Sequence, residues 1–195
     1  MSCFARRGFH QTAMHDISEA AGISVGLIYR YFESKEQVIA SMASRHLTEL
    51  QRKIEEARKL PALFDALEMV LWCDEHRIEV AASYVVDLFA ESGRNPRVRA
   101  LVAEVQNGLI HAVTALIASA PEAAHLAPGL GPRQAAEIVF HTIHGLMFDE
   151  ILHIEDRTQS ELMKNRTETL HRLWALLFPA LQATASSAAA NSDAS

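Results

Sequence analysis

The segment 12–37 holds several signals for helix ends in quick succession. Thr12 is a good N-cap for a short first helix, and Gly22 suits the left-handed residue that ends one. Ser24 can cap a second short helix, which is expected to span 25–32. Two short helices joined by a tight glycine turn form the helix-turn-helix arrangement, whose second helix enters the major groove of DNA. This local pattern constrains the fold more than any other part of the chain.

The second short helix is predicted to have two unlike faces. Ile28 and Phe32 share one side, where they can pack on the preceding helix. Tyr and Arg side chains on the other side can donate to phosphates or base edges, and apolar ones can touch thymine methyl groups. A glycine there lets the backbone approach a base closely. The residues of this second side are Gly26, Leu27, Tyr29 and Arg30, flanked by Val25 and Tyr31. The pattern favours a DNA-recognition helix over a small three-helix core with a solvated polar face.

A third helix is predicted directly afterwards, because Ser34 and Gln37 have the spacing of a capping box. Lys35 falls in its first turn, where a positive charge opposes the helix dipole and a phosphate partner would explain it. Residues 1–60 carry nine Lys and Arg against seven Asp and Glu, although the whole chain has a net charge of −6. Any polyanion is therefore expected to meet the first part of the chain.

The rest of the chain has the periodicity of amphipathic helices, and no stretch alternates with period two. A loop is expected over 120–131, and a frayed tail from 182 onward. The remaining helices are predicted at 34–58, 62–76, 78–91, 96–119, 133–155 and 159–178. The fold class is therefore all-α, with an N-terminal helix-turn-helix and a helical C-terminal body.

Several functional classes find no support in the sequence. Two cysteines do not form a disulfide framework, and no export signal precedes the first helix. The best candidate for a membrane span, 80–90, is interrupted by Asp87. No nucleophile–base pair, phosphate loop or dinucleotide fingerprint is present, so no enzyme activity is predicted. We expect a soluble, cytoplasmic protein that has no membrane partner.

The front segment resembles the DNA-binding segment of TetR-type (tetracycline-repressor-like) transcriptional regulators over about residues 4–38. In that family a longer helix precedes the position of Gly8, so the first helix is expected to be largely missing here and the natural chain to begin upstream. The residues that carry the resemblance are Phe9, Thr12, Ile17, Ala21-Gly22-Ile23-Ser24, Gly26, Ile28-Tyr29, Tyr31-Phe32 and Ser34-Lys35-Glu36.

The resemblance implies a homodimer that binds a palindromic operator on double-stranded DNA, represses transcription, and is released by a small-molecule effector. Its parts would be a DNA-binding domain over 1–48, an effector-binding and dimerisation domain over 49–180, and a flexible tail over 181–195. Phosphates would be held by Thr12, Tyr29, Tyr31 and Lys35. The full DNA-binding set that it implies is Thr12, Ser24, Val25, Gly26, Leu27, Tyr29, Arg30, Tyr31 and Lys35.

The C-terminal body offers candidates for the effector site and the dimer interface. The segment 78–90 is apolar nearly all round, which predicts a central helix. Side chains on or near such inner segments can line an effector cavity or be ordinary core: Trp72, Tyr84, Asp87 and His111. The last two helices have broad apolar stripes that fit a dimer interface or close their own monomer. The stripes are Ile138, Val139, Ile143, Leu146, Met147, Ile151 and Ile154, then Leu162, Leu170, Leu173, Trp174 and Leu177.

Two alternatives remain from other classes of protein. The first is a helical-bundle metal-binding enzyme, because Glu-x-x-His occurs three times, a spacing that di-iron helical bundles use, and Glu150 with His153 is the pair that can face inward. A weaker pair is His141 with His144. Because a metal needs three or four converging ligands, no metal and no cofactor is expected. The other alternative is a dimeric ligand-binding module that has lost DNA binding.

Overall fold

A computed structural model describes residues 8, 11–71, 78–153 and 156–181. These residues contain helices and no strand, so the predicted all-α fold class is confirmed. The elements are α2 (Met14–Ala21), α3 (Val25–Tyr29), α4 (Lys35–Ala57), α5 (Leu63–Leu71), α6 (Ile78–Ser92), α7 (Pro96–Ser119), the short 3₁₀ helix η2 (Pro121–His125), α8 (Pro132–Leu152) and α9 (Gln159–Leu177).

The predicted helix boundaries agree closely with the structure outside two places. The second short helix ends at Tyr29 instead of Phe32, because the Arg30 amide donates to the Leu27 carbonyl three residues back, and this tightens the last turn. The predicted loop over 120–131 contains η2. The ends of two predicted helices, 72–76 and 154–155, and the tail from 182 lie outside the described residues.

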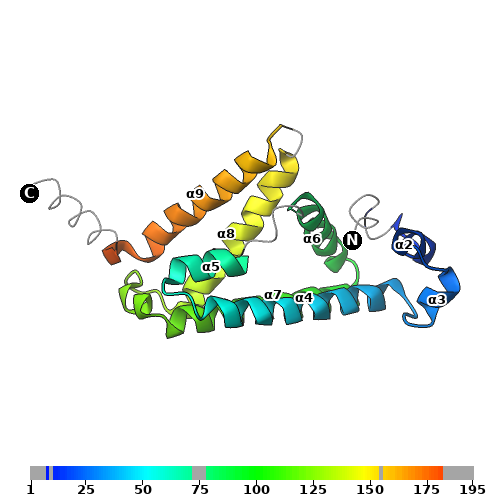
Figure 1. Cartoon of the computed structure of the whole chain (residues 1–195), viewed down its shortest axis with the longest axis horizontal. Helices are drawn as coiled ribbons and strands as arrows, with labels where there is room; N and C mark the ends of the chain where they lie inside the picture. Colours follow the sequence, from blue (N-terminus) through cyan, green and yellow to red (C-terminus); the bar gives the residue numbers. More distant parts are fainter. Residues whose placement is uncertain (1–7, 9–10, 72–77, 154–155, 182–195) are drawn as a thin grey trace, which may run out of the picture.

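Two long helices, α4 and α7, run side by side along the length of the molecule (Figure 1). The helices α2 and α3 lie at one end of this pair, and α8 and α9 lie on the far side of α6 from them. The helix α6 packs on both α7 and α8, between the α2–α3 end and the rest of the body. The helix-turn-helix therefore occupies one end of the molecule.

The described core falls into two apolar clusters. The larger cluster joins α4, α5, α7, α8 and α9, and it includes Leu67, Ile117, Val139 and Phe178. The smaller cluster holds the helix-turn-helix together, and its buried residues are Met14, Ile17, Ile28, Val38, Ile39 and Val98. Val98 comes from α7, and Val85 and Leu88 of α6 pack on the same cluster. The core of the helix-turn-helix is therefore completed by residues of α6 and α7, which belong to the C-terminal body.

The predicted central position of the 78–90 helix is only partly met. Residues 85–89 of α6 are half-buried, and the fully buried apolar residues of the larger cluster come from other helices. Among the described helices, α7 is the one long and apolar enough by length and composition to cross a membrane. The sequence prediction had placed the best such run at 80–90. Because α7 packs against α4, α6 and α8, its apolar residues have an alternative explanation as part of the fold.

Candidate DNA-binding surface

The helix α2 begins one residue later than predicted. Its N-cap is Ala13, whose amide donates to Oδ2 of Asp16 at 2.7 Å. Thr12 is instead buried at 1% exposure, and its hydroxyl donates to the Gly8 carbonyl at 2.7 Å. The N-cap prediction for Thr12 was wrong, because the helix begins one residue later and Ala13 holds the N-cap position. The buried hydroxyl of Thr12 ties the start of the module to the preceding chain.

The turn between α2 and α3 has the predicted form. Gly22 is left-handed, with φ 67° and ψ 27°, and its amide donates to the Glu19 carbonyl at 3.0 Å. Two residues later, Oγ of Ser24 accepts from the Leu27 amide at 3.2 Å and so caps α3. The glycine turn and the serine cap fix the direction in which α3 leaves α2.

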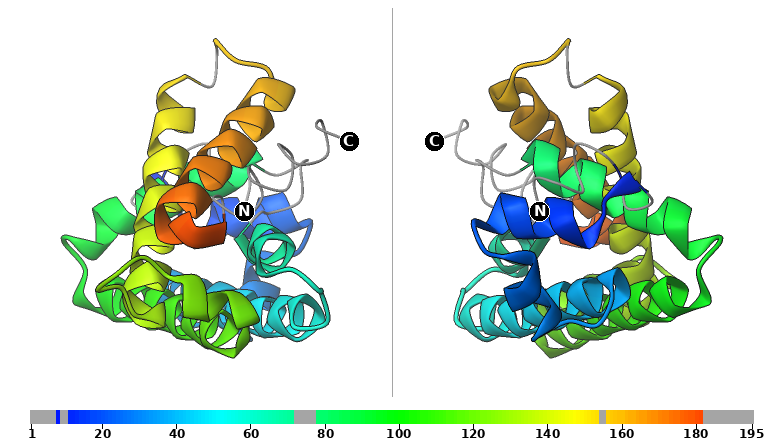
Figure 2. Two further views of the ribbon diagram at one scale, coloured as in Figure 1. Left: turned by 90° about the vertical axis from the view of Figure 1, so that its left-hand side faces the viewer. Right: turned by 90° about the vertical axis from the view of Figure 1, so that its right-hand side faces the viewer.

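One side of α3 is anchored in the smaller cluster. Ile28 is 3% exposed and lies with Met14 and Ile17 of α2, and Phe32 packs on the same group. The predicted inward face is therefore confirmed. Anchoring at Ile28 leaves the other side of the short helix exposed. The right-hand view of Figure 2 shows α2 and α3 at the near end of the molecule.

The outward side of α3 and the turn that follows it carry two large aromatic side chains. Tyr29 is 53% exposed and Tyr31 is 71% exposed, and Gly26 and Arg30 are exposed as well. Val25 and Leu27 are half-buried. Within the described residues, no hydrogen bond is made by the hydroxyl of either tyrosine or by the Arg30 guanidinium. The structure thus brings together every predicted groove-facing residue on one end of the molecule.

The entry to α4 links this module to the body. Oγ of Ser34 accepts from the Gln37 amide at 3.4 Å, and Gln37 Oε1 accepts from the Glu33 amide at 2.7 Å. Oε1 of Glu36 accepts from Nδ2 of Asn95, the N-cap of α7, at 3.4 Å. Hydrogen bonds from its own backbone amide and from the Ser34 side chain lower the pKa of the Glu36 carboxyl below its usual value. Lys35 is half-buried beside this junction.

The structure describes the side chains of two of the four predicted effector residues, Asp87 and His111. Trp72 lies outside the described residues, as does the side chain of Tyr84, whose backbone belongs to α6. His111 is exposed on α7. Asp87 is half-buried and faces the front module, because an atom at the Cβ position of Gly8 would lie 3.4 Å from its Oδ2. Burial raises the pKa of the Asp87 carboxyl.

An aromatic contact between α6 and α8 was not found from the sequence. The ring of His144 lies with its centroid 4.0 Å from that of Phe140 and 5.4 Å from that of Phe89. Nδ1 of His144 donates to the Phe140 carbonyl at 2.9 Å, which leaves Nε2 of the neutral ring as an acceptor. Burial lowers the pKa of His144 and favours this neutral form. The sequence signal was present, since His144 follows Phe140 by one helical turn.

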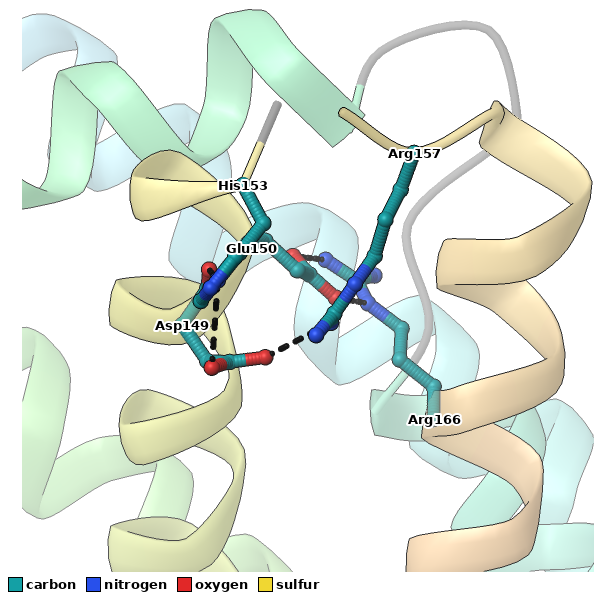
Figure 3. A network of polar contacts seen from close by, with 5 residues as sticks. All are labelled: Asp149, Glu150, His153, Arg157 and Arg166. Atoms are coloured by element: carbon teal, nitrogen blue, oxygen red, sulfur yellow. Dashed lines mark hydrogen bonds and ion pairs between the residues drawn. The ribbon is translucent and has the colours of Figure 1, made fainter. Parts of the chain in front are cut away.

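In each of the three Glu-x-x-His pairs, Glu122/His125, Glu150/His153 and Glu168/His171, the glutamate has another partner. The carboxylate of Glu150 is taken by the Arg166 guanidinium across the α8–α9 interface, and His153 lies beside Asp149 (Figure 3). Glu122 accepts from the Leu63 amide at 3.1 Å, and Glu168 pairs with Arg172. In the described parts of the chain, no three His, Cys, Asp or Glu side chains gather as metal ligands.

Comparison with known proteins places these observations in a family. Residues 1–42 match the model of the tetR family of bacterial regulatory proteins. The Fatty acid metabolism regulator protein of Bacillus subtilis (strain 168) is 23% identical over 71% of this chain and 73% of its own length. The transcriptional regulator UidR of Escherichia coli (strain K12) is 23% identical over 75% of this chain and 74% of its own.

Solved structures share the fold along most of the chain. Bacillus subtilis FadR in complex with stearoyl-CoA has a TM-score of 0.67 at 19% identity, covering 90% of this chain and 92% of that one. Salmonella enterica GusR has a TM-score of 0.63 at 24% identity, covering 90% of each chain. The match of residues 1–42 and the regulators that are similar over most of the chain identify it as a DNA-binding transcriptional regulator whose front segment is of TetR type.

Proposed function

We propose that the chain is a homodimeric repressor that binds a palindromic operator in double-stranded DNA and is released by a small molecule. The observation that carries this proposal is the outward face of α3, where Tyr29, Arg30 and Tyr31 are exposed while Ile28 is anchored in the core. The family is bacterial, and we place the site of action in the cytoplasm, where the chromosome lies.

The DNA contacts divide by chemistry. Phosphates would be held by Tyr29, Tyr31, Lys35 and Ser24, whose positions surround the outward face. The residues proposed to face base edges are Val25, Gly26, Leu27, Tyr29 and Arg30. Thr12 is assigned a positioning role, because its buried hydroxyl donates to Gly8.

An exposed row on α8 supports dimerisation. Its members recur at intervals of three and four residues, the spacing of one helix face. Phe148 is 46% exposed and Leu152 is 78% exposed, and the whole row is Ile138, His141, Gly145, Phe148 and Leu152. The predicted stripe on α9 is mostly used inside the monomer, since Leu162, Leu170, Leu173 and Leu177 are buried. From α9 we therefore assign to the interface only Leu176, at 72% exposure.

Two-fold pairing of α8 would join two copies through the same surface on each. Such pairing would present two copies of α3 to one duplex. The half-sites would then lie about 34–36 Å apart, one turn of DNA.

The effector site is proposed between α6 and α8, around Phe89, Phe140 and His144. This is an apolar, aromatic region with one hydrogen-bond acceptor, Nε2 of His144. It suits a ligand with an apolar body and a donor group. The complex of FadR with stearoyl-CoA makes a long-chain acyl-CoA the first ligand to test.

The helix α6 supports a connection between effector and DNA. Phe89 contacts His144, and Val85 and Leu88 of the same helix pack on the cluster that holds α3. A ligand that displaces α6 would therefore shift the residues that pack on the apolar cluster of the helix-turn-helix.

The proposal is tested by selecting bound duplexes from a random pool with the full chain, then weighing the complex by light scattering. We expect enrichment of one palindromic sequence and two chains per duplex, with release on adding stearoyl-CoA. Failure to enrich any sequence would overturn the DNA-binding proposal. Enrichment without release would overturn the acyl-CoA proposal alone.

A further inference from the structure

Gly26 has no structural reason to be a glycine. It sits in the first turn of α3, is exposed, and does not have a positive φ. A Cβ built on it would meet no heavy atom within 4 Å. Glycine also destabilises a helix relative to alanine. The fold alone would therefore accept, and gain from, a side chain at this position.

The space beside Gly26 lies where a recognition helix meets base edges, since in helix-turn-helix proteins the N-terminal residues of the second helix make those contacts. Its neighbours Val25 and Leu27 are apolar and half-buried, so no side chain from 25 to 27 can donate to or accept from a base. The one feature of a major-groove edge that an apolar surface reads is the thymine methyl group.

We infer that the operator has a thymine opposite Gly26, and that its 5-methyl group occupies the space which a side chain would fill. The flanking side chains of Val25 and Leu27 form an apolar surface that contacts this methyl group. Gly26 is thereby a specificity-determining residue. The inference rests on the proposed function, because it needs α3 in the major groove.

A different partner would also explain a glycine. If a sugar–phosphate strand approached this turn, any side chain at 26 would clash, whatever the base. Uracil substitution distinguishes the two cases, because it removes the thymine methyl group without changing base pairing. It would relieve a clash with the methyl group, but it would not relieve a clash with the sugar–phosphate strand.

The test combines Gly26→Ala with uracil substitution, using operators recovered by selection with the parent protein. Each thymine of a half-site is replaced in turn, symmetrically in both halves, and dissociation constants are measured by fluorescence anisotropy. For the parent protein, uracil at one position should lower the binding affinity about fourfold per half-site, which corresponds to the burial of one methyl group. Gly26→Ala should lose at least about tenfold on the thymine operator, as overpacking predicts. The affinity of the Gly26→Ala variant should recover when uracil replaces thymine at that same position, and at no other.

Thymines at the other positions are matched controls, where the losses from uracil and from Gly26→Ala should simply multiply. Urea unfolding of Gly26→Ala should show a midpoint equal to or above that of the parent, which separates lost binding from lost folding. Equal losses on thymine and uracil at every position would overturn the inference and leave DNA binding standing. So would a variant that binds as well as the parent. If the parent selects no sequence, the proposed function fails and this inference fails with it.

Discussion

Glu150 of α8 and Arg166 of α9 form a two-armed ion pair that is almost completely buried, with side-chain exposures of 1% and 5% (Figure 3). The guanidinium fork matches the two carboxylate oxygens. Charges so far from water are costly unless paired. The pair therefore sets how α8 and α9 face each other, although each residue falls within an apolar stripe of its helix.

Removing one partner of this pair should be strongly destabilising. Arg166→Met leaves the Glu150 carboxylate buried without its guanidinium, and the free energy of unfolding should fall by about 3–5 kcal/mol. The double variant Arg166→Met with Glu150→Leu should recover most of the lost free energy of unfolding. Urea unfolding measures both. The control is Arg172→Met on the same helix, whose exposed pair with Glu168 should be worth less than about 1 kcal/mol. Equal effects of the two single variants would contradict this assignment.

Tyr29→Ala should weaken operator binding by at least about tenfold, because it removes a large exposed contact from the outward face of α3. Tyr29→Phe keeps the ring and should lose less, so the pair separates the hydroxyl from the ring. Anisotropy titration measures the affinity, and light scattering should show an unchanged dimer. A Tyr29→Ala variant that binds like the parent would mean that another surface reads the DNA.

Asp87→Asn should stabilise the protein at neutral pH. Burial raises the pKa of this carboxyl in the folded state, so the fold favours the protonated form. The ionised form therefore costs stability above the folded pKa, and the cost disappears below the unfolded value of about 3.9. Urea midpoints should show a gain for Asp87→Asn at pH 7 that shrinks toward pH 4. Glu55→Gln, at an exposed position of α4, should show no such gain. A gain independent of pH would refute the titration argument.

Phe148→Glu should separate the dimer, because it places a charge in the middle of the exposed row on α8. The monomer should remain folded, since Phe148 is already 46% exposed. Sedimentation velocity measures the mass. The matched control is Met69→Glu on α5, which is 37% exposed and outside that row. A Phe148→Glu protein that stays dimeric would place the interface elsewhere.

The local signals of the sequence predicted the helix-turn-helix well. Gly22 and Ser24 act through their own backbone neighbours, so their roles can be deduced without the rest of the fold. Ile28 was assigned correctly because its face follows from helical spacing alone. Thr12 was misassigned as a cap, because the helix begins one residue later, at the N-cap Ala13, and the Thr12 hydroxyl donates to the Gly8 carbonyl, a contact with the preceding chain that helix-end signals do not predict.

The C-terminal body was predicted as helices but not as a set of contacts. Periodicity located α8 and α9, yet it could not tell which apolar residues one monomer buries, and most of the α9 stripe proved internal. The pairing of Glu150 with Arg166 and the edge-to-face contact of His144 with Phe89 depend on the relative placement of different helices. Single-helix patterns carry no information on that placement.

The most direct measurement of the central claim is protection of guanine N7 from methylation on a selected operator. If two copies of α3 lie in successive major grooves, the bound protein should protect two patches on one face of the duplex, centred about 10 base pairs apart. Tyr29→Ala should abolish both patches together. Protection in a single patch, or binding that leaves every major-groove N7 reactive, would contradict the account.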